Sequence, residues 1–284
     1  MKKLFSIILV FLISYNHALA KDKLNVVTTL SAISAITEDI LGNTADVTNI
    51  MPEGSSHHHY SFSPKNIEVV KNADLFIYLD ENFEVGIDKL KASNSLKLMQ
   101  IKDLKILPNK DFHIWLDVEN TIKIAKKIKE EGIKLLPNYQ TEITSNYNKL
   151  RINLLTIDAQ IKKELQSLQN YKAIILHNSL NYFTNRYNLQ ALIDLDLHSE
   201  TSLSPKVLEE INQYQTNNNL RCIFYDNPHN LPTAKNLSKK LNLPIIQLDT
   251  EILKLENSYE TGQKYAIILL KIKDSFKRCF GNGL

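Results

Sequence analysis

The chain has 284 residues, of which 43% are apolar and 23% are charged, so its composition is that of an ordinary globular protein. Its seven glycines form neither the G-x-G-x-x-G nor the G-x-x-x-x-G-K-[ST] pattern, which excludes nucleotide binding through those two loops. One large α/β domain and two smaller lobes are both compatible with this length. The pattern of elements along the chain must decide between them.

The first twenty residues have the features of a secretory signal peptide. Lys2 and Lys3 precede an apolar run from Leu4 to Tyr15, and Ala18-Leu19-Ala20 provides small residues for cleavage after Ala20. The run is shorter than the ~20 apolar residues of a membrane-spanning helix, and no later stretch approaches that length. We therefore expect a periplasmic protein that is exported and is not embedded in the membrane.

The charge of the exported part is nearly balanced. Removal of Lys2 and Lys3 leaves 32 basic residues against 31 acidic residues, a net charge near +1. This balance gives no electrostatic support for binding to nucleic acid.

From Lys23 to about Leu135, short β-rich runs alternate with helical stretches, which predicts a mainly parallel sheet with helices on its faces. Ser31 is expected to cap a helix through Leu41, and Ser63-Pro64 to begin another. The other elements expected here are strands over residues 24–28, 46–51, 75–79 and 96–100 and a helix over 83–91.

The middle of the chain is predicted to form one long helix. No glycine occurs between Gly132 and Gly262, and apolar residues recur at spacings of three and four. The helix would run from about Asn138 to Leu168, roughly 45 Å at 1.5 Å per residue. A solitary coiled coil would explain the same stripe, but we interpret the helix as a rigid connection between two lobes. Its apolar positions are Ile143, Tyr147, Leu150, Leu154, Ile157, Ile161 and Leu165.

The alternation of strands and helices then resumes. Strands are expected over residues 171–176, 192–197, 221–225 and 244–248, with helices after Ser204-Pro205, after Leu231-Pro232 and from about Glu260 to Arg278. The predicted fold class is therefore α/β, with two βα lobes, each with a mainly parallel sheet, joined by a long backbone helix. The expected lobes are residues 21–137 and 169–284, and the helix spans 138–168.

Three consecutive histidines, His57, His58 and His59, lie in the loop that follows the second expected strand. A histidine run in a loop that also contains Pro52 and Gly54 can equally form a solvated surface. Imidazole is nevertheless the side chain best suited to zinc and its borderline neighbours, so this loop is a candidate ligand segment.

Two further histidines lie at the ends of predicted elements. His113 is in a short connection before a helix whose expected N-cap is Asp117, although a packing role beside Trp115 is an alternative. His177 is the first polar residue after the apolar run 173–176, and ligands of open α/β sheets gather beyond the carboxyl ends of strands. A capped loop histidine is the alternative for His177.

Asp249 directly follows the strand expected over 244–248, although an aspartate at such a position is also a common cap or turn residue. Taken together, His58, His113, His177 and Asp249 come from four separate connections, two in each half of the chain. Three imidazoles and one carboxylate form a chemically suitable tetrahedral set for zinc. We assign no role to His198 or His229.

Four segments carry a resemblance to a known family. They are Met51–Tyr60, with His58 at the ligand position, Asp111–Asp117, Ile175–His177 with Tyr182-Phe183 following, and Leu248-Asp249. These segments resemble those of the periplasmic metal-binding proteins of zinc and manganese ABC importers, most closely the zinc-specific, ZnuA-like members. The likeness extends from the first strand to the last helix, and Asp111–Asp117 is its most specific motif.

The resemblance implies a monomer that holds Zn²⁺ between two lobes as a transported ligand. It also implies delivery to a membrane permease driven by a cytoplasmic ATPase, and no catalysis. A manganese-binding member of the family is the alternative. A secreted zinc hydrolase is a less favoured alternative, because a fourth protein ligand is available and no H-E-x-x-H pair occurs. A surface adhesion protein is a third interpretation.

The sequence differs from the family pattern in two places. Thr250-Glu251 follow Asp249, where the family usually has a proline and a glycine. The segment Ile101–Lys110 is short and lacks histidine, whereas zinc-type members often have a long loop there that is rich in histidine and aspartate.

Cys222 and Cys279 both lie in the exported part, where an oxidising compartment favours a disulfide. The bond would attach the last helix to the sheet of the second lobe, and zinc-type members of the family can carry a cysteine pair in corresponding places. Two buried free thiols are the alternative. Neither cysteine is a candidate metal ligand.

Overall fold

The computed structural model describes residues 23–52, 60–108, 111–189, 192–195, 205–217, 219–226, 228–248, 250 and 261–281. The expected signal peptide and two of the candidate ligands, His58 and Asp249, lie outside these residues. Within the described part of the chain, no helix combines the length and the apolar character needed to cross a bilayer.

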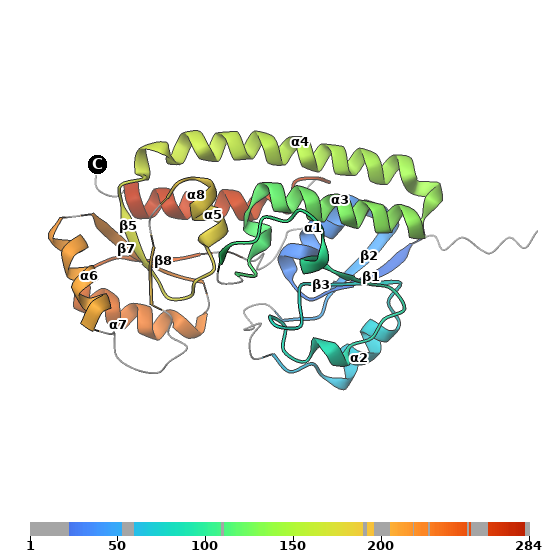
Figure 1. Ribbon diagram of the computed structural model, residues 1–284, viewed down its shortest axis with the longest axis horizontal. Helices are drawn as coiled ribbons and strands as arrows, with labels where there is room; N and C mark the ends of the chain where they lie inside the picture. Colours follow the sequence, from blue (N-terminus) through green and yellow to red (C-terminus); the bar gives the residue numbers. More distant parts are fainter. Residues whose placement is uncertain are drawn as a thin grey trace, which may run out of the picture.

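Two four-stranded sheets, each at one end of the molecule, form the two lobes (Figure 1). Each sheet has the same order of strands, with its first strand between the second and the third, and every pairing between the described strands is parallel. This agrees with the predicted two-lobe α/β fold. The N-terminal lobe contains β1 (Leu24–Thr28), β2 (Ala45–Asn49), β3 (Leu75–Tyr78) and β4 (Ser95–Lys97), and the C-terminal lobe contains β5 (Lys172–Ile175), β6 (Leu192–Asp194), β7 (Leu220–Tyr225) and β8 (Ile245–Gln247).

The helices follow the strands in the alternation that the sequence predicts. In the first half they are α1 (Ser31–Leu41), α2 (Pro64–Lys71) and α3 (Val118–Leu135). The long α4 (Gln140–Leu165) comes next, and the second half contains α5 (Asn181–Arg186), α6 (Pro205–Thr216), α7 (Leu231–Leu241) and α8 (Ala266–Gly281). The short helix α5 was not predicted.

Two of the expected helix caps are present. The Ser63 side chain accepts a hydrogen bond from the backbone N–H of Asn66, so Ser63 caps α2 as expected. The Asp117 carboxylate accepts from the backbone N–H groups of Glu119 and Asn120 and caps α3. The expected cap at Ser31 is wrong, because the N-cap position of α1 is Leu30 and Ser31 is already helical.

The helix expected over residues 83–91 is also wrong. The segment forms turns and a single 3-10 turn at Ile87–Lys89, because Gly86 has a φ of 85°, outside the right-handed helical region. The Glu84 carboxylate further holds the turn by accepting from the backbone N–H of Leu79 at 2.7 Å and of Asp80 at 3.1 Å. Local hydrogen bonds and a left-handed glycine therefore override an apolar spacing compatible with a helix.

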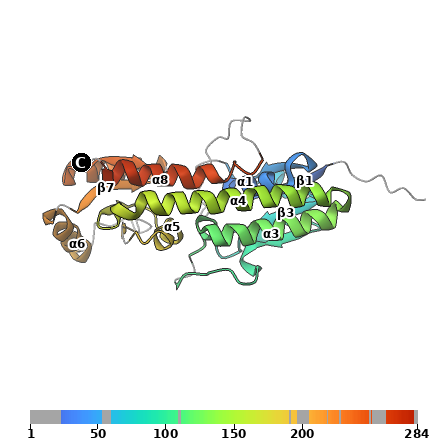
Figure 2. The ribbon, with the colours of Figure 1, turned by 90° about the horizontal axis from the view of Figure 1, so that it is seen from above.

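The long helix α4 runs along both lobes and lies between α3 and α8 (Figures 1 and 2). Its predicted apolar stripe is buried throughout, apart from the half-buried Tyr147. The same hydrophobic cluster contains residues from β1, from α4 and from β5, so one core extends through both lobes. Burial of this stripe fixes α4 against each lobe.

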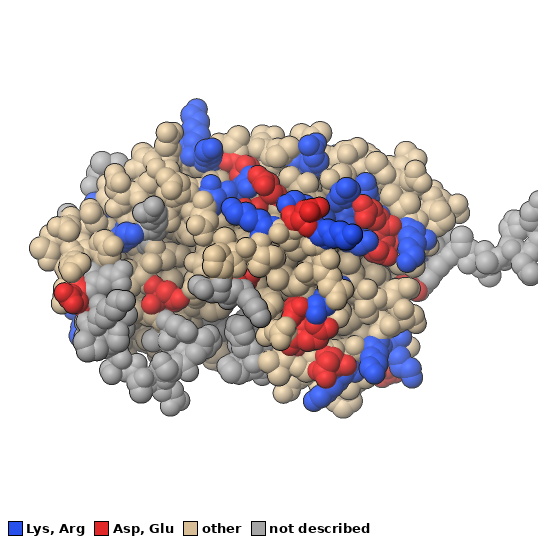
Figure 3. Space-filling view, in the orientation of Figure 1, with Lys and Arg blue, Asp and Glu red and all other residues tan. Residues whose placement is uncertain are grey.

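The exposed face of α3 and α4 carries positive and negative side chains in alternation (Figure 3). On α3, for example, Lys127 pairs with Glu131 at 3.0 Å, one helical turn away. Such pairs at the surface of a helix contribute little to stability, about 0.3–0.5 kcal/mol each, but they keep this face mixed in charge.

A buried carboxylate fastens the start of the last helix to the N-terminal lobe. Asp39 of α1 accepts from the backbone N–H groups of Gly262 at 2.7 Å, Lys264 at 3.2 Å and Tyr265 at 2.9 Å. Gly262 has a φ of 90°, and a Cβ there would lie 3.2 Å from the backbone N of Leu150 in α4. The final helix, expected from about Glu260, therefore begins only at Ala266, after this anchored turn.

Asp39→Asn should destabilise the protein by about 1–3 kcal/mol, because the amide NH₂ would face the backbone N–H of Tyr265 and leave a buried donor unpaired. Burial raises the pKa of Asp39 from 3.8 to about 6, against the opposing effect of its N–H donors. The folded chain therefore binds the proton more tightly than the unfolded chain, and the Asp39 contribution to stability falls as pH rises from about 4 to 6. The difference in free energy of unfolding between wild type and variant, measured by urea denaturation, should be larger near pH 4 than near pH 7.

Asp46→Asn, at an exposed carboxylate, is the control for this experiment. Equal urea midpoints for the wild type and both variants would contradict this role of Asp39.

The structure joins Cys222 of β7 to Cys279 of α8 by a disulfide, with a Cα–Cα distance of 5.6 Å. Both residues are buried. Because the bond closes a loop with a sequence separation of 57, the chain-entropy model gives a stabilisation of about 4 kcal/mol, less any strain. The disulfide attaches the end of α8 to the sheet of the C-terminal lobe.

The double variant Cys222→Ala with Cys279→Ala should melt at a lower temperature and remain folded, because alanine leaves no buried hydroxyl behind. Thiol titration of the denatured, unreduced wild type after export to the periplasm should find no free thiol. Two titratable thiols would show that the bond does not form in the cell.

Candidate metal centre

His113 is held in a tight turn in front of α3. Its backbone N–H donates to Asp111 Oδ1 at 2.9 Å, and its Nδ1 lies 2.8 Å from the same oxygen. The ring of Phe83 packs edge-on to the imidazole at 5.6 Å between centroids, and the ring of Trp115 lies at 5.2 Å. His113 is 6% exposed, so both its position and its orientation are restricted.

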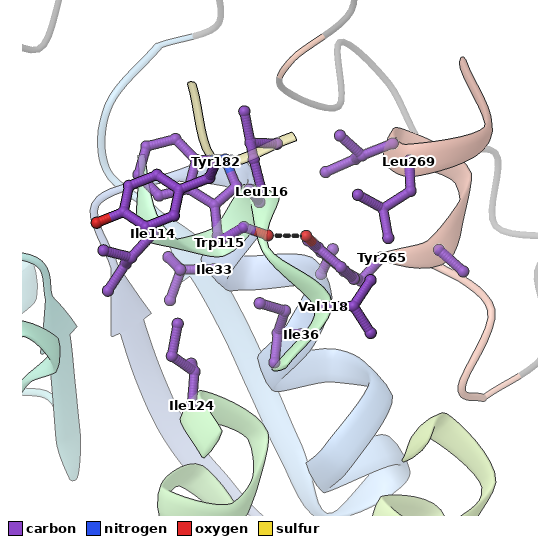
Figure 4. Close-up of a cluster of buried hydrophobic side chains, with 14 of the residues drawn as sticks. Ile33, Ile36, Ile114, Trp115, Leu116, Val118, Ile124, Tyr182, Tyr265 and Leu269 are labelled. Carbon is purple, nitrogen blue, oxygen red and sulfur yellow. Dashed lines mark hydrogen bonds between the residues drawn. The ribbon is translucent and has the colours of Figure 1, made fainter. Parts of the chain in front are cut away.

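The turn after His113 is anchored in the core of the N-terminal lobe. Ile114, Trp115 and Leu116 are fully buried among side chains of α1 and α3 (Figure 4). The hydroxyl of Tyr265 donates to the carbonyl oxygen of Trp115, as Figure 4 also shows. The sequence therefore places His113 on a rigid support, because the apolar residues that follow it bury this turn.

His177 comes from the other lobe, beyond the carboxyl end of β5. Its Nδ1 lies 2.7 Å from Oδ2 of Asp226, which directly follows the neighbouring strand β7. The hydroxyl of Ser179 donates to the same carboxylate oxygen at 2.9 Å. The parallel pairing of β5 with β7 thus brings this histidine and its carboxylate together at one edge of the sheet.

The two imidazoles meet between the lobes. Their centroids are 5.3 Å apart, and the rings are inclined at 71°. In a neutral imidazole whose Nδ1 donates to a carboxylate, Nε2 carries the lone pair, which is the arrangement found in histidine ligands of metals. Each histidine therefore has a carboxylate partner of the kind that orients histidine ligands in metal sites.

The two carboxylates are held in the ionised form. Burial acts to raise the pKa of Asp226, but the hydrogen bonds from His177 and Ser179 outweigh it and lower that pKa below its usual value. Burial likewise opposes ionisation of Asp111, whose pKa is lowered by His113 and by a hydrogen bond from Asn181. Buried negative charge beside each imidazole favours a positively charged partner at this place.

Within the described residues, no group of three or more histidine, cysteine or acidic side chains is arranged to hold a metal ion. Of the four candidate ligands, the described residues include His113 and His177. His58 lies between Pro52 and Tyr60, and Asp249 follows Leu248, whose backbone N–H donates to the carbonyl of Tyr225 at 2.8 Å. Leu248 thus lies at the carboxyl end of β8, on the same side of the sheet as His177 and Asp226.

Asp111 and Asp226 were not predicted to have a role at the site. A signal for Asp226 was present, since it is the first acidic residue after an apolar strand, as Asp249 is. Asp111 belongs to the motif of His113, but only the turn geometry shows that it holds the imidazole. His229 is exposed in a 3-10 turn before α7, and His198 lies outside the described residues.

The family model described as zinc-uptake complex component A, periplasmic (ZnuA), matches residues 26–279. The chain belongs to this family. ZnuA-family members are the substrate-binding components of ABC importers and are transport proteins rather than enzymes.

Two known proteins are similar in sequence to this chain. An uncharacterized Rickettsia prowazekii protein, RP014, is 26% identical over 282 residues, which cover 95% of this chain and 89% of the relative. The zinc-binding lipoprotein AdcA of Streptococcus pneumoniae R6 is 24% identical over 286 residues, which cover 93% of this chain and 57% of the lipoprotein. The chain thus spans only a little over half the length of AdcA.

Solved structures confirm the fold. The Zn(II)-bound ZnuA-like domain of S. pneumoniae AdcA has a TM-score of 0.72 at 24% identity, covering 91% of this chain and 99% of that domain. The periplasmic zinc-binding protein TroA of Treponema pallidum has a TM-score of 0.74 at 21% identity, covering 91% and 99% of the two chains. At these identities the likeness concerns the fold alone.

Proposed function

We propose that this protein captures Zn²⁺ between its two lobes, with His58, His113, His177 and Asp249 as ligands, and delivers it to a membrane permease driven by an ATPase. The observation that carries the proposal is the contact between His113 and His177, one from each lobe, at 5.3 Å between ring centroids. Each ring is tied through Nδ1 to a buried carboxylate, as expected for a ligand of a transported metal.

The choice of zinc follows from the nitrogen content of the ligand set. Imidazole suits zinc, whereas manganese prefers sets rich in oxygen, and the general affinity order also places zinc above manganese. The names of AdcA and TroA describe zinc binding by those proteins, which supports the same cargo here. Export through the expected signal peptide would place the protein in the periplasm, where such capture occurs.

Protein purified from the periplasm without chelator or affinity tag should contain one zinc per chain by elemental analysis. A comparable concentration of Mn²⁺ should fail to displace it, because three imidazoles favour zinc. His177→Ala should lose most of its zinc affinity, and His229→Ala, at the exposed histidine before α7, should bind as the wild type does. Exchange of zinc for manganese would show that the metal is wrongly assigned, and absence of any bound metal would remove the proposal.

Asp226→Ala should weaken zinc binding by about 10–100-fold, because His177 loses the acceptor that fixes its ring and its tautomer. The measurement is a competition titration against a chelator of known affinity, with the melting temperature recorded for each variant. Asp274→Ala on α8 is the matched control, since its carboxylate is 61% exposed and pairs with Lys273. If both variants bind zinc as tightly as the wild type, Asp226 has no part in orienting the ligand.

A further inference from the structure

The short helix α5 makes direct hydrogen bonds between the lobes, immediately after His177. Asn181 Nδ2 donates to Asp111 Oδ2 at 3.0 Å, and the hydroxyl of Tyr182 donates to the carbonyl oxygen of Asp111 at 3.0 Å. The backbone N–H of Leu107 donates to the same hydroxyl at 3.1 Å. The start of α5 is therefore bound to the segment that carries His113.

The carboxylate of Asp111 divides its two oxygens between the lobes. Oδ1 is bonded to the Nδ1 and the backbone N–H of His113 in the N-terminal lobe, and Oδ2 accepts from Asn181 in the C-terminal lobe. Any separation of the lobes at this place must break the bond to Asn181. The carboxylate that orients His113 would then lose one of its fixed partners.

The other end of α5 is fixed to α4 and to the start of α3, which lie outside the C-terminal lobe. Arg186 binds the Asp158 carboxylate of α4 through two bonds, at 2.6 and 2.7 Å, and Tyr187 donates to the same carboxylate at 2.9 Å. Arg186 also approaches Asp117, the cap of α3, at 3.4 Å. Because the Arg–carboxylate bond is bidentate and partly buried, it restricts rotation of α5. Asn181 is thus presented to Asp111 from a rigid support.

We propose that Asn181 is a positioning residue that couples the two lobes at the metal site and slows release of the metal. The inference rests on the proposed function for its effect on zinc, and on the Asn181–Asp111 hydrogen bond for its effect on the lobes. While the bond is present, Asp111 is held from both sides and His113 keeps its orientation toward His177. Loss of the bond lets the lobes separate more easily and the metal leave faster.

The Asn181–Asp111 pair permits an exchange experiment. Asn181→Asp places two carboxylates in contact, and Asn181→Ala simply removes the donor. In the double variant Asp111→Asn with Asn181→Asp, the new amide of residue 111 can donate to the new carboxylate and still accept from His113. Asn185→Ala is the matched control, because Asn185 is exposed on the same helix and its side-chain amide donates to the carbonyl oxygen of Asn181.

Zinc release into excess chelator, followed by stopped flow, should be about tenfold faster or more in Asn181→Ala and faster still in Asn181→Asp. The exchanged double variant should release zinc more slowly than Asn181→Asp, because a donor and an acceptor again face each other between the lobes. A variant that acts only through the packing of α5 would not be rescued by moving the charge. Release as slow as in the wild type for both single variants, or a double variant faster than either, would overturn the proposal.

A measurement without metal separates this proposal from the proposed function. The distance between the lobes can be measured by pulsed electron paramagnetic resonance. The spin labels are attached to cysteines introduced at two exposed positions, Lys65→Cys on α2 and Lys239→Cys on α7. In the metal-free protein, Asn181→Asp should broaden the distance distribution and the exchanged variant should narrow it again. Unchanged distributions would refute the coupling even if zinc binds, and a broadened distribution would support it even if the wild type proved to bind no zinc.

Discussion

Burial of the apolar stripe of α4 is the constraint on which the rest of the molecule depends. The stripe packs against both lobes, so the two sheets share a continuous core instead of being joined by a flexible linker. At about 25 cal/mol for each Å² of apolar surface removed from water, a stripe of this length opposes any independent rotation of the lobes. This frame helps to bring the rings of two histidines that are more than sixty residues apart in the sequence to 5.3 Å between centroids.

Three buried carboxylates fix local segments of the two lobes. They differ in whether the folded protein raises or lowers the pKa of the carboxyl group. Asp39 is surrounded by backbone N–H donors within the core, and burial keeps its pKa near 6. Asp111 and Asp226 face imidazoles, and their pKa values are lowered despite burial. Asp39 holds the turn before α8 against α1. Asp111 and Asp226 concentrate negative charge at the proposed metal site.

Much of the fold could be predicted from the sequence because its signals are local. The alternation of strands and helices, the caps at Ser63 and Asp117 and the spacing of the α4 stripe all depend on neighbouring residues. The elements that were predicted wrongly depend instead on contacts between residues distant in sequence, or on the hydrogen bonds of one particular turn. The late start of α8 depends on Asp39, more than two hundred residues earlier, and the turns over 83–91 depend on Glu84 binding backward to Leu79 and Asp80. At the site, His113 and His177 were recognisable by position, whereas their pairing with Asp111 and Asp226 is a property of the folded chain.

The position of Trp115 has a practical consequence. It is the single tryptophan of the chain, it is buried, and its ring lies 5.2 Å from that of His113. The indole therefore acts as an intrinsic optical reporter of the site, with no second tryptophan to dilute its emission. Events at His113 can be followed in the unmodified protein by ultraviolet fluorescence, without a dye, a label or an added cysteine.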